Sequence, residues 1–566
     1  MFNEAVSYYK NSFEGKNVKN VFLYGNITEK SFFSIAPLSY ALDNLKIDLH
    51  VNFGESFEIL FDVWKAYLEK DEVLVSFIKN IEGKISNFGS FFEKPDVVIK
   101  AGEDCFSGDI KLEFKYKWFN DYRKDDLRKA TDLIIKECYA LKNEETFSIG
   151  IALLPEKLKN PLQDYLDSYA ISFNMYLSAV DICRNVLVKG STQRLSMRDE
   201  PESVSELLTT LLGLELEKDI DEEVFKKYRI VSEKFNISRL KIPEASFFVS
   251  TKGYHGKHSF GEVFGYPTKN KKTKWSSPGS MIYKFHWYPQ SEDEERPPKS
   301  RLNFTQTVPI DNFIESTLID YNVMRSRNKE IGDALAKCDK IVVKSNIENG
   351  CDFAVGLLKK NGERRRILYS DSDTRYVINP RILEETGKEM GMMANIPGGE
   401  AFTTPVSLKG KIVGDCVIQI DKSYRLNSDN PFVAESDGVT YNVVSGPKEV
   451  VDAFNEKKND AWNNLIEQEK AGLDSKLVEL KKNNFEKIGE FAINTNPNAK
   501  LCDYLIINEK IANMIHVAFG SGFEPETATE YHMDVVIDSP RQKLDIYGID
   551  ENNNEHWILK EGKFVI

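Results

Sequence analysis

Acidic and imidazole side chains stand inside short apolar segments in the last third of the chain. The five side chains are those of Glu400, Glu490, His516, His532 and Asp534. A carboxylate among apolar neighbours is unfavourable unless it is paired or binds a metal ion. Because the segments are far apart in sequence, only a tertiary fold can bring the five groups together. The sequence therefore predicts a rigid core that holds several polar groups, enough to bind two metal ions.

The pair His532 and Asp534 has the most informative spacing. Val535, Val536 and Ile537 follow it, and this apolar run predicts a strand. Side chains two residues apart on a strand point to the same face, so both groups can reach one ion. Imidazole and carboxylate groups are preferred ligands of zinc and of other first-row divalent metals. Two such ions, roughly 3.5–4 Å apart, can activate water for hydrolysis.

Two of these residues, taken singly, have an alternative interpretation. A lone buried histidine such as His516 is more often a core residue whose imidazole is hydrogen-bonded to a backbone group. Glu490 lies between Gly489 and Phe491, and it is as compatible with a salt bridge as with a metal ligand. Spacing alone leaves both alternatives open.

Four sequence blocks resemble the signature blocks of the leucyl aminopeptidases of the aminopeptidase T type, a thermophilic-aminopeptidase family of dinuclear metallopeptidases. Pro397-Gly-Gly-Glu-Ala-Phe-Thr-Thr-Pro405 is similar to the family's Pro-Gly-Gly-Glu-Val-Phe-Thr-Ala-Pro block. The other three blocks are Ile488–Pro497, Glu509–Gly520 and His532–Asp534. The resemblance covers about residues 340–566 of the chain.

The resemblance implies a metal centre, substrates and an oligomeric state. The implied ligands are Glu400, Glu490, His516, His532 and Asp534. They would hold two divalent metal ions, which could be zinc, cobalt, manganese or magnesium. The implied substrates are peptides with a free N-terminus, and the implied assembly is a homodimer.

One position departs from the family pattern. The family usually has a tyrosine seven residues after the first ligand histidine, and Phe523 stands there in this chain. A phenol that could bind metal or stabilise the tetrahedral intermediate is therefore missing. Tyr531 is a secondary candidate for this role, but on a strand it would point to the face opposite to that of His532.

The N-terminal part of the chain predicts a separate α/β region over residues 1–240. A strand at 20–24, a helix at 34–43 and a strand at 47–51 follow one another, which is typical of a parallel sheet. A chain of 566 residues exceeds what one hydrophobic core usually supports, so two or three domains are expected.

Residues 340–566 are predicted to form a β-rich α+β catalytic domain with a dinuclear metal site. Apolar runs of about 4–8 residues are typical of sheet strands, and one such run spans 413–420. A long amphipathic helix is predicted at about 447–487. The intervening residues 241–339 are interpreted as a connecting or substrate-side segment.

A histidine pair lies in that intervening segment. His255 and His258 accompany Glu262 and four glycines within residues 251–267. The two histidines are secondary candidates for a third metal site or a substrate-facing loop. The alternative is a glycine-rich surface loop, since a flexible histidine pair without a fixed scaffold binds metal weakly.

Charge and cysteine usage exclude several classes of protein. The formal net charge of -13 argues against nucleic acid or an anionic membrane as the main partner. The seven cysteines are scattered and include no Cys-x-x-Cys pair, so neither a disulfide framework nor a zinc–cysteine site is expected. The sequence has no run of about 18 apolar residues and no N-terminal signal pattern, so a cytoplasmic location is expected.

The expected function is that of a metal-dependent aminopeptidase with a metal-activated water. Glu490 is expected to bridge the two ions, and Glu509, the nearest unassigned carboxylate, is the candidate for moving a proton to the leaving amine. Two alternatives stay open. One is a peptidase-fold binding or assembly protein whose catalysis is weakened by Phe523, and the other is a metallohydrolase that acts on non-peptide amides.

Overall fold

The protein is described by a computed structural model, which divides it into two compact units. The described residues are 2–25, 29–53, 62–63, 65–66, 69–81, 96–100, 105–107, 110–113, 123–153, 158, 160–183, 185–192, 222–237, 244–250, 301–387, 389, 391–470 and 472–566. The first unit comprises Met1–Phe285, Ser291–Ile314 and Asp373–Met393, and the second comprises His286–Gln290, Glu315–Ser372 and Ala394–Ile566. The segment 251–267, with His255 and His258, lies outside the described residues.

A largely parallel sheet forms the centre of the first unit. The strands of its eight-stranded sheet run in the order β13-β9-β8-β6-β7-β2-β1-β3. Neighbours pair in parallel from β9 to β7 and from β2 to β3, and the two parallel groups meet at the antiparallel pair of β2 and β7. The strands are β1 (Asn20–Gly25), β2 (Asp48–Phe53), β3 (Val97–Lys100), β6 (Thr146–Leu153), β7 (Asn185–Thr192), β8 (Ala245–Ser250), β9 (Arg301–Gln306) and β13 (Met393–Asn395).

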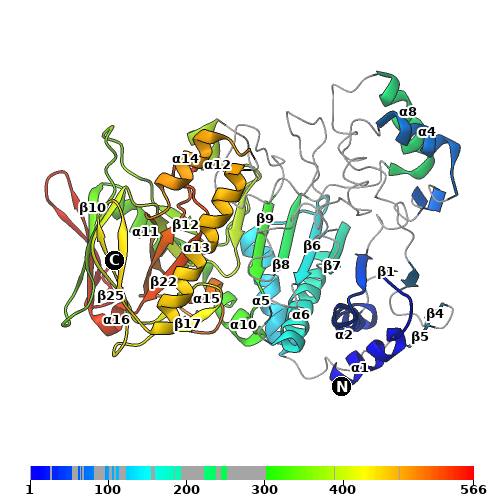
Figure 1. Cartoon of the computed structure of the whole chain (residues 1–566), viewed down its shortest axis with the longest axis horizontal. Coiled ribbons are helices and arrows are strands. Elements are labelled where there is room, and N and C mark those ends of the chain that lie inside the picture. Colours follow the sequence, from blue (N-terminus) through cyan, green and yellow to red (C-terminus); the bar gives the residue numbers. More distant parts are fainter. Residues whose placement is uncertain are drawn as a thin grey trace. The chain divides into compact units, whose positions relative to one another are not determined.

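Helices cover this sheet, and a small two-stranded hairpin lies beside its edge strand β3. The long helix α6 packs on β6, β7 and β8, and α2 packs on β2 (Figure 1). Among the residues that the structure describes up to position 317, the helices are α1 (Phe2–Phe13), α2 (Glu29–Leu45), α4 (Glu72–Ile81), α5 (Lys124–Ile134) with a π-helical continuation over Ile135–Tyr139, α6 (Pro161–Val180), α8 (Glu222–Phe235) and α10 (Ile310–Thr317). Helix α12 (Pro380–Thr386) comes later. The hairpin consists of β4 (Cys105–Ser107) and β5 (Ile110–Leu112).

Two antiparallel sheets form the second unit. The eight-stranded sheet has the order β19-β18-β15-β11-β10-β23-β24-β25, and the seven-stranded sheet has the order β12-β14-β20-β21-β22-β16-β17. The first consists of β10 (Cys338–Ser345), β11 (Asp352–Gly356), β15 (Ser407–Gly414), β18 (Phe432–Asp437), β19 (Tyr441–Ser445), β23 (Leu544–Asp550), β24 (Glu555–Lys560) and β25 (Lys563–Phe564). The second consists of β12 (Leu368–Ser370), β14 (Glu400–Thr403), β16 (Val417–Gln419), β17 (Ser423–Arg425), β20 (Ile488–Asn494), β21 (Ile515–Gly520) and β22 (His532–Ile537).

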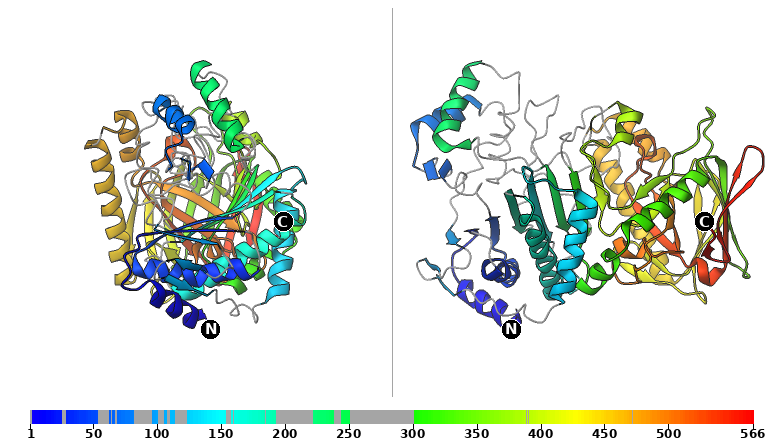
Figure 2. Two further views of the ribbon diagram at one scale, coloured as in Figure 1. Left: turned by 90° about the vertical axis from the view of Figure 1, so that its right-hand side faces the viewer. Right: turned by 180° about the vertical axis from the view of Figure 1, so that it is seen from behind.

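One apolar cluster holds the two sheets of the second unit together. It contains Ile341 and Phe353 of one sheet and Phe491, Val517 and Val535 of the other, together with side chains of α13. Figure 2 shows α13 (Lys448–Lys470) and α14 (Ser475–Asn483) running along the outside of these strands. The remaining helical segments of this unit are α11 (Tyr321–Leu335), α15 (Leu505–Asn508), the 3-10 turn Pro525–Thr527 and α16 (Ser539–Gln542). The seven-stranded sheet therefore buries one face in this core.

The second unit begins before the change of sequence texture at residue 340. Helix α11 belongs to this unit because it packs on β10, β12, β14 and β24. Its start is fixed by Asp320, whose side chain accepts hydrogen bonds from the backbone N–H groups of Asn322 and Val323. Residues 315–339 are thus part of the second unit, whose start had been predicted at residue 340.

Two predicted elements of the second unit were too long. The helix predicted over 447–487 is interrupted, because Gly472 adopts a φ of +90° and Asp474 caps the new helix α14 through Lys476 N and Leu477 N. The strand predicted over 413–420 is two strands, β15 and β16, in different sheets. The chain turns between them at Asp415, whose carboxylate accepts a hydrogen bond from Asp538 N at 2.9 Å.

No helix within the described ranges combines the length and the apolar composition that crossing a membrane requires.

Candidate metal centre

The five predicted ligands lie on four neighbouring strands of the seven-stranded sheet. Glu400 begins β14, Glu490 lies on β20, His516 on β21, and His532 and Asp534 on β22. These strands are adjacent in the order β14-β20-β21-β22. The tertiary structure thus brings together five side chains that the sequence spreads over more than a hundred positions.

The strand register places these side chains on one face of the sheet. Glu490 is opposite Ala518, and Ala518 is opposite Asp534 on the next strand. Side chains that lie opposite one another across paired strands share a face. The next pair along the two strands, Phe491 and Val517, belongs to the apolar core on the other face. The small side chain of Ala518 leaves room for the two carboxylates to approach each other.

A β-bulge in β20 is needed for this arrangement. The pairing of β20 with β21 shifts between Ile488 and Glu490. Without the shift, these two residues would point to the same face, whereas Ile488 belongs to the apolar core and Glu490 to the cluster. Gly489 makes the bulge possible, because a Cβ there would lie 2.1 Å from the carbonyl oxygen of Ser521.

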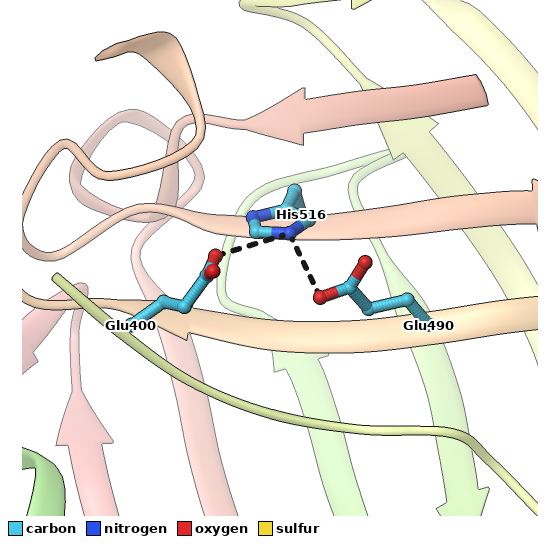
Figure 3. Close-up of side chains that lie close together, drawn as sticks. All are labelled: Glu400, Glu490 and His516. Atoms are coloured by element: carbon cyan, nitrogen blue, oxygen red, sulfur yellow. Dashed lines mark ion pairs between the residues drawn. The ribbon is translucent and has the colours of Figure 1, made fainter. Parts of the chain in front are cut away.

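The first group of candidate ligands consists of Glu400, Glu490 and His516. Figure 3 shows both carboxylates directed at the same edge of the imidazole ring. His516 Nε2 lies 3.6 Å from Glu400 Oε2 and 3.4 Å from Glu490 Oε1. All three side chains are buried. Their donor atoms lie within 4.8 Å of one another, which is close enough to hold one ion.

The second group shares Glu490 with the first and adds His532 and Asp534. His532 Nε2 lies 3.2 Å from Glu490 Oε2 and 3.1 Å from Asp534 Oδ1. Glu490 therefore offers one oxygen to each group. The side chain of His532 is 33% exposed, whereas those of Glu490 and Asp534 are buried. Solvent thus reaches the cluster at His532.

Hydrogen bonds at Nδ1 orient both imidazole rings. His516 Nδ1 lies 2.9 Å from Asn494 Oδ1, and His532 Nδ1 lies 2.7 Å from the carbonyl oxygen of Ser521. A carbonyl oxygen can only accept, so Nδ1 of His532 carries the hydrogen and donates. Nε2 of each ring then faces the carboxylates. This is the arrangement by which proteins hold a metal-binding histidine, with one ring nitrogen on a carbonyl oxygen and the other on the metal.

A buried lysine joins the cluster at Glu400. Lys510 Nζ lies 2.5 Å from Glu400 Oε1 and 2.8 Å from Glu509 Oε1, and its side chain is 1% exposed. Glu509 follows helix α15 and is thus held beside the first group through Lys510. Glu509, the predicted proton carrier, is therefore linked to the predicted ligand Glu400 through the ion pairs that both make with Lys510.

The cluster attracts positive charge, as its pKa values show. Burial lowers the pKa of an imidazole, but the Glu490 carboxylate raises that of His516 to about 9. His532 likewise has its pKa raised well above the ordinary value by Asp534 and Glu490, against the effect of burial. Burial raises the pKa of Glu400 to about 7, although Lys510 opposes this. The histidines lower the pKa of Glu490 despite its burial.

The donor set fits divalent cations. Its atoms are carboxylate oxygens and imidazole nitrogens, which suit zinc, cobalt and manganese, whereas soft sulfur ligands lie elsewhere in the described chain. Glu400 Oε2 is buried and accepts no hydrogen bond in the part of the chain that the structure describes. A buried carboxylate oxygen in that state is costly, and a bound cation would satisfy it.

The two aromatic candidates have different surroundings. The Tyr531 hydroxyl lies 2.6 Å from that of Tyr441 and also donates to the carbonyl oxygen of Phe485, and its ring belongs to the apolar core. Its phenol is thus directed away from the five ligands, so it is not the replacement phenol considered above. Phe523 packs on the ring of His532 with centroids 5.7 Å apart, and on that of Phe402 at 4.7 Å.

The residues that support the candidate ligands were not predicted from the sequence. These are Gly489, Asn494, Lys510 and the backbone carbonyl group of Ser521. The position of Asn494 could have been predicted, because it lies four residues after Glu490 on a strand and so shares its face. That of Lys510 could not, since its side chain reaches Glu400 only through the tertiary structure.

Comparisons with known proteins gave a distant likeness among solved structures. No family model matches the chain. No curated protein matches it either. Among solved structures, the chain is similar to wild-type AmpT from Thermus thermophilus, with 14% sequence identity and a TM-score of 0.43. The likeness covers 78% of this chain and 100% of that chain.

Proposed function

We propose that the protein is a metal-dependent hydrolase that removes N-terminal residues from peptides and uses two divalent cations. One observation carries this proposal. Glu490 offers its two carboxylate oxygens to two different groups of ligands, one with Glu400 and His516 and one with His532 and Asp534. A carboxylate shared in this way is what a pair of closely spaced ions requires.

The choice of peptide substrates rests on the sequence blocks that resemble the aminopeptidase T family. The geometry alone supports a two-cation hydrolase, and the resemblance adds the substrate class. The bound cations would supply a water of lowered pKa and would polarise the scissile carbonyl group. Zinc, cobalt, manganese and magnesium are all compatible with the proposal.

The protein's own residues orient the site and carry protons. Asn494 and the Ser521 carbonyl group hold the rings of His516 and His532. Glu490 stays ionised, because the two histidines lower its pKa. Glu509 is proposed to take the proton from the attacking water and to transfer it to the leaving amine nitrogen. The partly exposed side of the cluster, at His532, is the side from which substrate would enter.

Metal content provides the first test. Protein stripped with a chelator and then dialysed against zinc, cobalt or manganese should retain about two ions per chain, as elemental analysis measures. A protein that retains none of the three metals would rule out the proposal. Aminoacyl amides and short peptides, with free and with acetylated N-termini, then define the substrate. Hydrolysis confined to free N-termini is expected, whereas cleavage of non-peptide amides alone would assign the site to another class of hydrolase.

The substitution Glu490→Gln tests the shared carboxylate. A neutral amide should lose an ion or leave the water inactive, so the rate of hydrolysis should fall by about a thousandfold or more, equivalent to about 4 kcal/mol. The matched control is Glu486→Gln, which alters a carboxylate four residues before Glu490 in the sequence. This carboxylate is 54% exposed and forms an ion pair with Lys458 of helix α13. Equal rates for Glu490→Gln and the parent, at the same pH and metal concentration, would make Glu490 a salt-bridge residue.

Phe523 favours a second candidate function. The family that the sequence resembles usually has a tyrosine at this position, and here a phenyl ring packs on His532. A chain with this change could bind metal and peptide with little turnover and act as a binding or assembly protein. Two bound ions, micromolar peptide affinity and no measurable hydrolysis would favour this candidate.

A further inference from the structure

The buried ammonium group of Lys510 distinguishes the two groups of ligands. Lys510 Nζ lies 2.5 Å from Glu400 Oε1, and Glu400 belongs to the first group only. The ion pairs that Glu490 makes within the described chain are with His516 and His532. A buried ammonium group, shared between Glu400 and Glu509, thus stands at one end of the cluster.

Lys510 is held in place by the backbone around it. Its carbonyl oxygen accepts a hydrogen bond from Asn496 N at 2.9 Å, and its own N–H donates to the carbonyl oxygen of Ile507 at 3.0 Å. The Asn496 side chain in turn donates to the carbonyl oxygens of Ser316 and Gly398. Gly398 is two residues before Glu400, so the lysine and its carboxylate partner are fixed on one framework. These contacts fix the backbone of Lys510, and the ion pairs with Glu400 and Glu509 hold its buried ammonium group.

We infer that Lys510 makes the two cation positions unequal. The inference rests on the proposed dinuclear function. The position formed by Glu490, His532 and Asp534 takes the first divalent ion. The position formed by Glu400, Glu490 and His516 takes the second ion more weakly. The ammonium group of Lys510, although it also pairs with Glu509, already occupies one oxygen of Glu400 and stands close to an incoming cation. The protein would then work with one resident ion and one exchangeable ion.

Exposure supports the same order of binding. The second group includes His532, whose side chain is 33% exposed, whereas the three side chains of the first group are almost fully buried. An ion that arrives from solvent reaches the His532 end first. Lys510 lies at the buried end, with a side chain that is 1% exposed. Water therefore screens its charge little at the nearby position.

Calorimetric titration of metal-stripped protein with zinc tests the inference. The parent protein should bind two ions in two steps whose dissociation constants differ at least tenfold. Lys510→Met, which removes the charge and keeps an unbranched side chain, should tighten the second step at least tenfold and bring the two steps together. Lys510→Arg, which keeps a positive charge, should retain two separated steps. An unchanged second step in Lys510→Met would overturn the inference.

Variants of the histidines assign the steps without changing Lys510. His532→Gln should abolish the tight step, and His516→Gln should abolish the weak step. The reverse assignment would overturn the inference even if Lys510→Met does not fold. Two equal steps in the parent would also overturn it and would leave the dinuclear proposal standing. Failure of the parent to bind any zinc would instead refute the proposed function itself.

Discussion

Phe523 is the residue at which the chain departs most clearly from the family that it resembles. Its ring packs edge-on against His532 and Phe402 and carries no hydroxyl group. A phenol at this place would add a hydrogen-bond donor beside the ligand that is most open to solvent. The side chain next to His532 in sequence cannot serve, since the Tyr531 hydroxyl is hydrogen-bonded to Tyr441 and Phe485.

Phe523→Tyr is therefore expected to raise the rate of peptide hydrolysis about tenfold, which corresponds to about 1.4 kcal/mol of transition-state stabilisation. The measurement is kcat/KM on a short peptide at matched metal content. Phe523→Leu is the control, because it removes the ring without adding a hydroxyl group and should give no increase. A rate for Phe523→Tyr at or below that of the parent would show that this position does not limit catalysis.

Strand β20 directs Glu490 toward the candidate metal centre only because of its bulge. Gly489 approaches the carbonyl group of Ser521 so closely that a Cβ would lie 2.1 Å from the oxygen. The same oxygen accepts the hydrogen bond from His532 Nδ1. The bulge therefore affects two candidate ligands. It sets the face of the sheet on which Glu490 lies, and it adjoins the Ser521 carbonyl group that accepts the hydrogen bond of His532.

Gly489→Ala should lower both thermal stability and metal content. The added methyl group forces a shift of backbone against backbone, so the loss should exceed about 1 kcal/mol. Differential scanning calorimetry and elemental analysis measure the two effects. Gly362→Ala is the matched control: its φ of +86° makes alanine strained, but the added Cβ meets nothing within 4 Å. That control should lose stability and keep its metal. Normal metal content in Gly489→Ala would show that the bulge is dispensable for the site.

The folding stability of the whole protein should depend on pH, because residues of the proposed metal centre change their charge with pH. The pKa of His516 is raised to about 9, above its unfolded value of about 6.5, so protonation of His516 stabilises the metal-free fold. That stability is fully present below about pH 6.5 and is lost as the pH rises through 9. The pKa of Glu400 is raised from 4.5 to about 7, so the metal-free fold also loses stability through Glu400, as the pH rises from about 4.5 to 7.

The melting temperature of metal-free protein is therefore expected to fall between about pH 6.5 and 9, because over that window His516 keeps its proton in the fold but not in the unfolded chain, while Glu400 contributes only up to about pH 7. Added zinc replaces those protons, so it should raise the melting temperature more at pH 8.5 than at pH 6. Differential scanning fluorimetry with and without chelator measures this. His516→Gln should flatten the upper part of the profile. A metal-free profile that rises over this window would contradict the charge balance described above.

The histidine pair of residues 251–267 lies outside the described residues, but its part in the metal count can still be predicted. The five candidate ligands of the second unit already form two groups that could each hold an ion. The double variant His255→Ala, His258→Ala should therefore retain about two ions per chain in elemental analysis. Loss of an ion on this change would add the segment to the metal centre and would require a different set of ligands.

The sequence by itself determined the types of ligand and their local geometry. His532 and Asp534 share a face because successive side chains alternate on any strand, a property of the covalent backbone. The same local rules predicted a strand, a helix and a strand at 20–24, 34–43 and 47–51, which correspond to β1, α2 and β2. The break between α13 and α14 was missed, although Gly472 and Asp474 were readable signals.

Only the tertiary structure decided how the ligands meet. The order β14-β20-β21-β22 follows from which apolar faces pack together in the core, and those faces come from segments far apart in sequence. The approach of Lys510 to Glu400 and the bulge at Gly489 depend on that same packing. Alternation along a strand is set by adjacent peptide units, whereas strand order and buried ion pairs are set by burial and pairing over the whole unit.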